Sequence, residues 1–193
     1  NQSSDNACHT RNVLEPQASQ KKGCIYMYKI LQKEDLNDNV CRMVIEAPLI
    51  ARKAKAGQFI IFRIDEEGER VPLTVADTDE ETGGVTIIFQ KVGAATRQLA
   101  EKEVGDSILD FVGPLGKPAA IEGYENACVI GGGVGSAIAY PTAKALKEQG
   151  AHVDVIAGFR NKDIVILEDD FREIADNLYI TTDDGSYGEK GFV

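Results

Sequence analysis

The chain has 193 residues, of which 43% are hydrophobic and 27% charged, and it carries a formal net charge of −10. This composition is typical of a folded protein and excludes a chain that is disordered throughout. The acidic balance, with no basic cluster, argues against nucleic acid or an anionic membrane as the main partner. The uncharged run at 127–143 is too short to span a bilayer.

Residues 1–26 are polar and lack the apolar core of a signal peptide, so we expect a disordered extension upstream of Met27. None of the four cysteines lies in a Cys-x-x-Cys pair. We therefore expect no metal site in this chain and a reducing, cytoplasmic location. Cys41 and Cys128 lie within apolar patterns and are expected to be small buried residues.

Residues 27–116 show the pattern of short strands separated by turns, which is typical of an antiparallel Greek-key barrel. One short helix is expected at 96–102. The expected strands cover 26–31, 40–46, 59–64, 71–76, 85–89 and 107–112.

Residues 117–193 alternate between strand and helix, which is typical of a doubly wound parallel sheet. The expected strands cover 126–130, 153–157 and 178–181, and the expected helices cover 136–149 and 168–175. Three strands are fewer than a dinucleotide-binding sheet contains, so we expect the full protein to continue past Val193. The predicted fold class is thus β plus α/β, a barrel followed by a truncated Rossmann-like unit.

An apolar strand that ends in clustered glycines is the most informative motif. It reads Gly131-Gly132-Gly133-Val134-Gly135 and runs into the helix expected from residue 136. Glycine lets the backbone approach a pyrophosphate closely, and the free N–H groups at a helix N-terminus attract that anion. The plain alternative is a loop-to-helix junction that binds no ligand.

A second candidate phosphate site combines Arg70-Val71-Pro72-Leu73-Thr74 with Gly93-Ala94-Ala95-Thr96. An arginine can hold a phosphate through two parallel hydrogen bonds, and a glycine turn that enters a helix can hold a pyrophosphate. Ordinary alternatives exist for each residue. Arg70 can be a charged residue beside the acidic turn before it, Thr74 a common strand residue, and Thr96 a helix N-cap.

Four motifs in order resemble the ferredoxin–NADP reductase superfamily: 70–74, Gly-Pro-Leu-Gly at 113–116, 131–135, and Asp-Asp-Gly-Ser-Tyr-Gly at 183–188. They are most similar to the branch that contains the electron-transfer subunit of dihydroorotate dehydrogenase. That branch also contains the small subunit of NADH-dependent ferredoxin–NADP oxidoreductase. The likeness runs from Met27 to Val193 and implies an FAD-binding barrel followed by a nicotinamide-binding unit.

The resemblance implies that Arg70 contacts the FAD phosphates and that Thr74, the candidate catalytic residue, forms a hydrogen bond near flavin N5. The other implied FAD contacts are Pro72, Leu73, Phe89, Gln90, Lys91, Gly93, Ala95 and Thr96. The implied nicotinamide dinucleotide contacts are Gly131, Gly132, Gly133, Val134 and Gly135.

The nucleotide preference depends on Arg160, which follows the second strand of the α/β unit. An arginine here can pair with the 2′-phosphate of NADP(H), or it can be a solvated loop residue beside Asp163. The branch that the motifs resemble usually uses NAD(H), and this is the expectation adopted.

The implied function is that of a flavoprotein oxidoreductase subunit. NAD(P)H passes a hydride to flavin N5, and electrons then leave singly for a larger catalytic subunit that resembles dihydroorotate dehydrogenase or glutamate synthase. A 2Fe–2S cluster is expected only in the full-length protein, because this chain lacks the required set of cysteines. The alternatives are a stand-alone ferredoxin or flavin reductase and a noncatalytic nucleotide-binding regulatory module.

Overall fold

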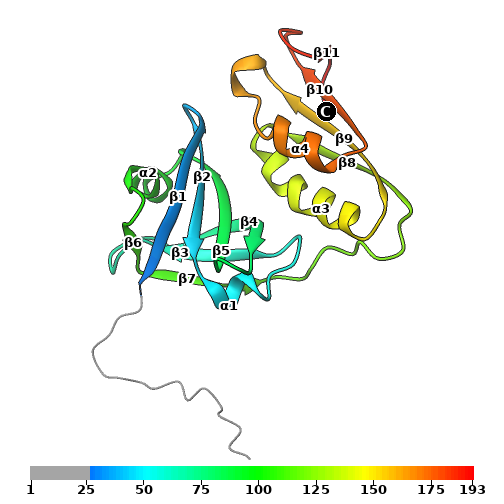
Figure 1. The fold of residues 1–193 in the computed structure, drawn as a ribbon. Helices are drawn as coiled ribbons and strands as arrows, with labels where there is room; N and C mark the ends of the chain where they lie inside the picture. The colour runs from blue at the N-terminus through cyan, green and yellow to red at the C-terminus, as the bar shows by residue number, and fades with distance from the viewer. Residues whose placement is uncertain (1–26) are drawn as a thin grey trace, which may run out of the picture.

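Two sheets of different kind follow each other along the chain in this computed structural model, which describes residues 27–193. A seven-stranded antiparallel sheet curls into a near-barrel, and a four-stranded parallel sheet with helices follows it (Figure 1). The predicted fold class is confirmed. The extension expected at 1–26, with Cys8 and Cys24, lies outside the described residues.

The antiparallel sheet has the strand order β6-β1-β2-β5-β4-β3-β7. Its strands are β1 (Tyr28–Asn37), β2 (Val40–Glu46), β3 (Phe59–Arg63), β4 (Val71–Asp79), β5 (Gly84–Gln90), β6 (Ser107–Ile108) and β7 (Asp110–Leu115). Two short helices, α1 (Pro48–Ala51) and α2 (Ala94–Glu101), accompany it. Its core consists of buried apolar side chains, among them Ile30, Met43, Ile45, Phe62 and Phe111.

A single residue connects the two edge strands of the near-barrel. The strands at the two ends of the sheet, β6 and β7, are separated in sequence by Leu109 alone. The Leu109 N–H donates to the carbonyls of Arg63 and Ile64, at 3.1 and 3.0 Å. The single strand expected at 107–112 is therefore wrong in one respect, because the chain passes from one sheet edge to the other at this point.

The parallel sheet has the strand order β11-β10-β9-β8. Its elements are β8 (Asn126–Gly132), the 3₁₀ turn η1 (Gly133–Gly135), α3 (Ser136–Glu148), β9 (His152–Phe159), η2 (Lys162–Ile164), α4 (Glu168–Ile174), β10 (Asn177–Thr182) and β11 (Glu189–Lys190). The sheet thus has four strands where three were expected. Two exposed charged residues form β11, and such a short polar segment has no apolar alternation to reveal it.

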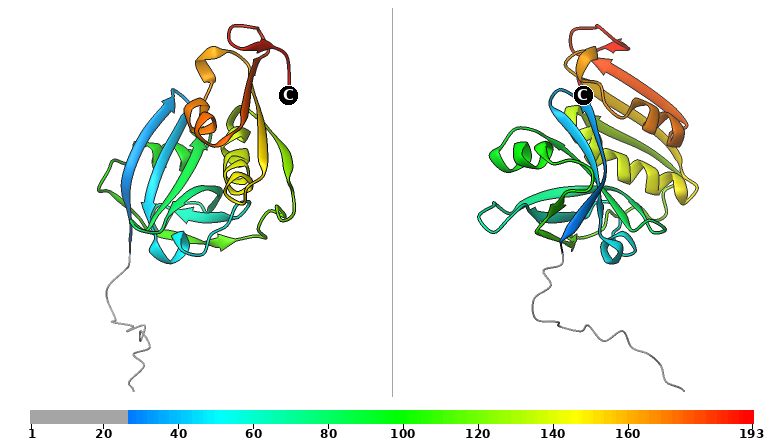
Figure 2. Two further views of the ribbon diagram at one scale, coloured as in Figure 1. Left: turned by 45° about the vertical axis from the view of Figure 1, so that its right-hand side comes forward. Right: turned by 60° about the vertical axis from the view of Figure 1, so that its left-hand side comes forward.

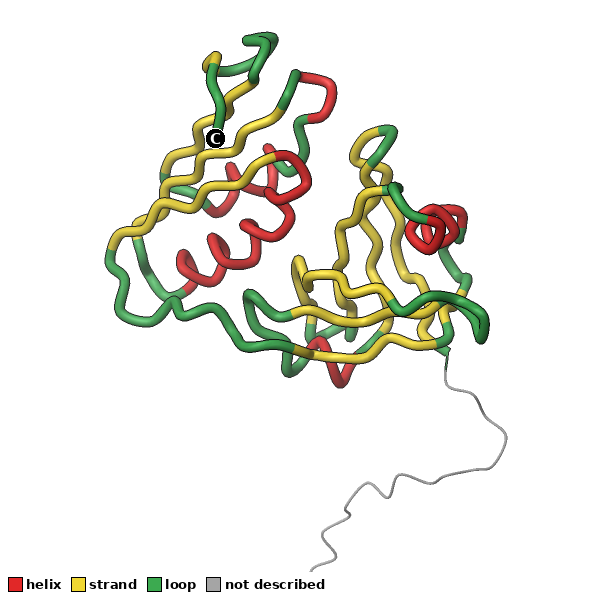
Figure 3. The backbone as a smooth tube through the Cα atoms, turned by 180° about the vertical axis from the view of Figure 1, so that it is seen from behind, coloured by secondary structure: helices red, strands yellow, loops and turns green. Residues whose placement is uncertain are grey.

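Both helices of the α/β unit lie between its sheet and the near-barrel (Figures 1 and 3). The two views of Figure 2 show α3 along this junction. Ala76 and Ile88 of the near-barrel belong to the same buried apolar cluster as Ala137, Leu146 and Phe171 of the helices. No helix within residues 27–193 is long and apolar enough to cross a membrane.

The far face of the parallel sheet is open, and this overturns the expectation for Cys128. Successive residues of β8 point to opposite faces, so Cys128 and Ile130 face away from the helices. Cys128 is exposed, and Ile130 and Tyr179 are 59% and 50% exposed. Cys41, by contrast, is fully buried as expected.

The two described thiols are therefore expected to react at very different rates. Burial raises the pKa of the Cys41 thiol to about 11, so at pH 8 the reactive thiolate is scarce as well as inaccessible. In a variant that carries Cys8→Ser and Cys24→Ser, an aromatic disulfide reagent should label Cys128 at once and Cys41 only on unfolding. Equal labelling rates for Cys41 and Cys128 in the folded variant would contradict the structure.

Candidate functional site

A cavity of about 310 Å³ opens where β4, β5 and the start of α3 meet. We call it the barrel cavity. It brings together many of the predicted site residues, namely Pro72, Leu73, Thr74, Phe89, Gln90, Thr96 and Val134. Its remaining lining residues were not predicted: Val71, Ile88, Val92, Ala137 and Ile138. Most of them are apolar residues that sequence reasoning reads as core.

The opening exists because β4 changes partners along its length. Its first half pairs only with β3, in the register Pro72↔Ile61 and Thr74↔Phe59. Pairing with β5 begins only at Val75, and the register shifts between Val75 and Asp77. One edge of the first half is therefore left facing the cavity. Proline suits such an unpaired edge, because it has no N–H group to donate.

A second cavity, of about 470 Å³, lies over the carboxyl ends of β8 and β9. We call it the sheet cavity. Ligands of open α/β sheets bind at these strand ends. Of the predicted residues it contains Gly132, Gly133, Val134 and Arg160, together with Gln90 from the near-barrel. Gln90, Val92 and Val134 line both cavities, so the two cavities adjoin each other at these residues.

The glycines of the strand–helix turn have different tasks. A Cβ on Gly131 would lie 2.8 Å from the Cα of Ser136, so glycine is required there for α3 to pack on β8. Gly133 has a φ of +54°, a conformation that side chains disfavour. A Cβ on Gly133 or Gly135 would meet nothing within 4 Å. These two residues thus border open space, which is where a ligand can approach the backbone.

The turn before α2 is organised around Thr96, but Thr96 is not the N-cap. The helix begins at Ala94 and its N-cap is Gly93, whose N–H donates to the Thr96 hydroxyl at 3.0 Å. The N-cap alternative for Thr96 is therefore wrong, and the reason is that its side chain reaches back from the first turn of the helix. Thr96 is 8% exposed and lines the barrel cavity, whereas Gly93 and Ala95 do not.

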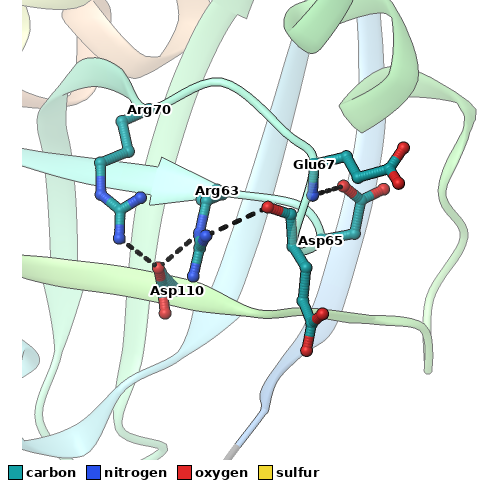
Figure 4. A network of polar contacts seen from close by, with 6 residues as sticks. Arg63, Asp65, Glu67, Arg70 and Asp110 are labelled. Atoms are coloured by element: carbon teal, nitrogen blue, oxygen red, sulfur yellow. Dashed lines mark hydrogen bonds and ion pairs between the residues drawn. The ribbon is translucent and has the colours of Figure 1, made fainter.

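Arg70 lies just before β4 rather than along it, and its side chain is 58% exposed. Its guanidinium nitrogen lies 3.2 Å from a carboxylate oxygen of Asp110, which also accepts a bond of 2.7 Å from Arg63 (Figure 4). Arg63, and not Arg70, reaches the acidic turn, at the carbonyl of Glu66. Arg70 lines neither cavity and would have to share its charge between Asp110 and a phosphate.

Lys91 also lies away from both cavities. Its ammonium group pairs with Asp35 at 2.7 Å, and this hydrogen bond lowers the pKa of the Asp35 carboxyl. Arg160, in contrast, is exposed at the rim of the sheet cavity, where Asp183 is a further lining residue. Asp110 and Asp35 are ion-pair partners that only the folded structure reveals.

Comparison with known proteins gives relatives over most of the chain. It is 53% identical over 172 residues to an uncharacterised protein of Clostridium beijerinckii. It is 47% identical over 165 residues to a dihydroorotate dehydrogenase B (NAD(+)) electron transfer subunit homolog of Thermotoga maritima. Each alignment covers 86% of this chain but 58% of the relative, so the chain spans well under two thirds of these proteins. No protein-family model matches the chain.

Comparison with solved structures gives similar proteins. A chain of an NADH-dependent reduced ferredoxin–NADP oxidoreductase, studied for flavin-based electron bifurcation, matches with a TM-score of 0.80 and 46% identity. The match covers 88% of this chain and 61% of that one. Phthalate dioxygenase reductase, at 16% identity and a TM-score of 0.70, shares the fold alone; the match covers 83% of this chain and 52% of that one.

A near-barrel followed by a parallel α/β sheet is the architecture that this chain shares with reductases of the ferredoxin–NADP type. In fold and in sequence the chain is similar to proteins of the ferredoxin–NADP reductase superfamily. Within it, the relatives include electron transfer subunits of dihydroorotate dehydrogenase B, such as that of Shouchella clausii at 34% identity over 170 residues, an alignment that covers 85% of this chain and 65% of the relative. The resemblance predicted from the four motifs is confirmed.

Proposed function

We propose that the chain is the flavin- and nicotinamide-binding part of an oxidoreductase electron-transfer subunit. Residues 27–116 bind FAD, and residues 117–193 bind the nicotinamide dinucleotide. The observation that carries this proposal is that the two cavities adjoin each other and share the lining residues Gln90, Val92 and Val134. A ring bound against the near-barrel and a ring bound at the strand ends can meet there. The names of the relatives support the same activity.

The residues fit the two ligands. The barrel cavity has mainly apolar walls with a hydroxyl at Thr74 and an amide at Gln90, which suits a flat ring with polar edges. The sheet cavity has Gly133 in a left-handed conformation beside open space, which suits close approach of a pyrophosphate. Arg70, Gly93 and Ala95 lie outside the lining of the barrel cavity, whereas Thr96 belongs to it, and these four residues would hold the phosphates of FAD.

Bound FAD supplies the hydride-accepting chemistry. The task of the chain is to hold two rings in contact and to exclude water. Leu73 of β4 and Val134 of η1 offer apolar surfaces to the barrel cavity, and the exposed side chains of Val92 and Ile138 line it as well. Thr74 positions a hydrogen bond at the flavin edge. Among residues 27–193, no Asp, Glu, His or Lys lines this cavity, so none of these residues offers a titratable side chain for proton transfer there.

The decisive experiment uses the full-length protein under exclusion of oxygen. A flavin absorbance band that bleaches on addition of NADH is expected, because both sites and hydride transfer are then present. A colourless protein that cannot be reconstituted with FAD would overturn the proposal. A protein that binds nucleotide but no flavin would favour the regulatory module instead.

We further propose that electrons leave for a larger catalytic subunit that resembles dihydroorotate dehydrogenase or glutamate synthase. The names of the relatives as electron transfer subunits support this over a stand-alone reductase. Co-purification of a larger subunit tests it. The described residues offer no group of three or more metal ligands, so a 2Fe–2S cluster does not fit this part of the protein. No step is assigned to such a cluster here.

We propose NADH rather than NADPH as the electron donor. The names of two relatives include NAD(+) or NADH, and this supports the proposal. Arg160 nevertheless stands at the rim of the sheet cavity, where a 2′-phosphate could reach it. If Arg160 is a solvated rim residue, Arg160→Ala should change the KM for NADH by less than about twofold. Steady-state kinetics with both nucleotides give the answer. A wild-type preference for NADPH that Arg160→Ala abolishes would contradict this assignment.

A further inference from the structure

Two ion pairs of opposite polarity join the near-barrel to the α/β unit. The ammonium group of Lys144 on α3 lies 2.7 and 2.8 Å from the two carboxylate oxygens of Asp77 on β4. The guanidinium group of Arg42 on β2 lies 2.7 Å from a carboxylate oxygen of Asp170 on α4. The cation is on the α/β unit in the first pair and on the near-barrel in the second.

These two pairs flank one small cavity, of about 140 Å³, that contains Arg42, Asp77, Tyr140 and Asp170. Burial raises the pKa of Tyr140 to about 12, so its hydroxyl remains neutral between the pairs. A slip of the α/β unit along the near-barrel would bring like charges together and separate unlike ones. The apolar cluster at the junction favours contact, but the alternating charges favour one register of that contact.

The Asp77–Lys144 pair connects the two elements that carry the proposed site. Asp77 follows Thr74 by three residues on β4, and Lys144 follows Ser136, the first residue of α3, by eight. A strand rises about 3.3 Å and a helix about 1.5 Å per residue, so the pair lies roughly 10 Å from Thr74 and roughly 12 Å from the glycine turn. A displacement at the pair is therefore carried directly to both walls of the site.

We propose that Asp77 and Lys144 are positioning residues that set the separation between the flavin-binding strand and the nicotinamide-binding turn. This inference rests on the proposed function. The side chains are 36% and 30% exposed, so the pair contributes little to overall stability. Its effect is geometric, because hydride transfer requires reacting atoms about 3–3.5 Å apart, and a misplacement of about 1 Å can cost on the order of a hundredfold in rate.

The test compares variants that break the interunit pair with one that breaks a matched pair on the same helix. Lys147 of α3 pairs with Asp176 at 2.7 Å within the α/β unit, so Lys147→Met is the control. In full-length protein, Asp77→Asn and Lys144→Met should slow flavin reduction at saturating NADH by about threefold to tenfold. FAD content and the KM for NADH should stay near wild type in all three variants. The reduction rate of Lys147→Met should also stay near wild type. The charge swap Asp77→Lys with Lys144→Asp should recover the rate.

Unchanged reduction rates in Asp77→Asn and Lys144→Met, or an equal loss in Lys147→Met, would overturn the inference. A second measurement stands apart from flavin chemistry. Spin labels placed as non-natural residues at the exposed positions Glu101 and Glu173 report the distance between the two units. This distribution should broaden in Asp77→Asn and in Lys144→Met, but not in Lys147→Met. If NADH fails to reduce the wild-type flavin, the proposed function fails, and an unchanged distribution would separately remove the positioning role.

Discussion

Replacing Gly131 by alanine is expected to destabilise the protein, although it adds a single methyl group. The new Cβ would lie 2.8 Å from the Cα of Ser136, a backbone atom that cannot turn aside. Helix α3 must then move off β8, and overpacking of this kind costs about 1–3 kcal/mol. Denaturant unfolding followed by circular dichroism measures the loss. The reduction of flavin by NADH should fall as well, because η1 carries Val134 and α3 carries Ala137 and Ile138 into the lining of the barrel cavity.

Gly135→Ala is the matched control for this prediction. Gly135 has helical backbone angles, and a Cβ there would meet nothing within 4 Å. The free energy of unfolding should therefore change by less than about 0.5 kcal/mol. If the open space beside Gly135 receives the dinucleotide, the KM for NADH should still rise, because the methyl group blocks approach to the backbone. Equal stability of the two alanine variants would show that α3 does not pack on β8 as described.

Replacing Thr74 by alanine is expected to slow the reduction of flavin while FAD stays bound. Thr74 lies on the half of β4 that pairs with β3 alone, and it lines the barrel cavity with its neighbours Pro72 and Leu73. If its hydroxyl forms the hydrogen bond near flavin N5, removal of a bond that stabilises the transition state costs about tenfold to a hundredfold in rate. Stopped-flow absorbance of the full-length protein with saturating NADH measures this rate constant.

Two further variants separate the hydroxyl from the packing of Thr74. Thr74→Ser keeps the hydroxyl and should retain most of the rate, whereas Thr74→Val keeps the shape and should lose as much as alanine. Thr78→Ala, farther along the same strand and outside the barrel cavity, should behave as wild type. Reduction kinetics of Thr74→Ala that match wild type would remove the catalytic role of this residue.

Local chemistry explains what could be predicted of the site. Pro72 and Thr74 were found by the arginine–proline–threonine pattern, and Gly133 by the clustered glycines, since such residues are needed wherever a backbone meets a ligand. The surroundings of three other residues could not be predicted from local chemistry. Arg70 pairs with Asp110, which lies 40 residues away; Lys91 pairs with Asp35; and Cys128 is exposed. In each case the outcome depends on a partner or a layer that is distant in sequence.

The sequence by itself determined the two classes of sheet, the strand–glycine–helix turn and several of the residues that line the two cavities, such as Pro72, Thr74 and Gly133. These features follow from side-chain period and backbone freedom, which act over a few neighbouring residues. Only the tertiary structure decided that Gly131 serves packing while Gly133 and Gly135 border open space. It alone also decided that Asp77 meets Lys144 across the junction. Such contacts join segments that are close only after both units have folded and docked. No local sequence pattern encodes which of these distant residues will meet.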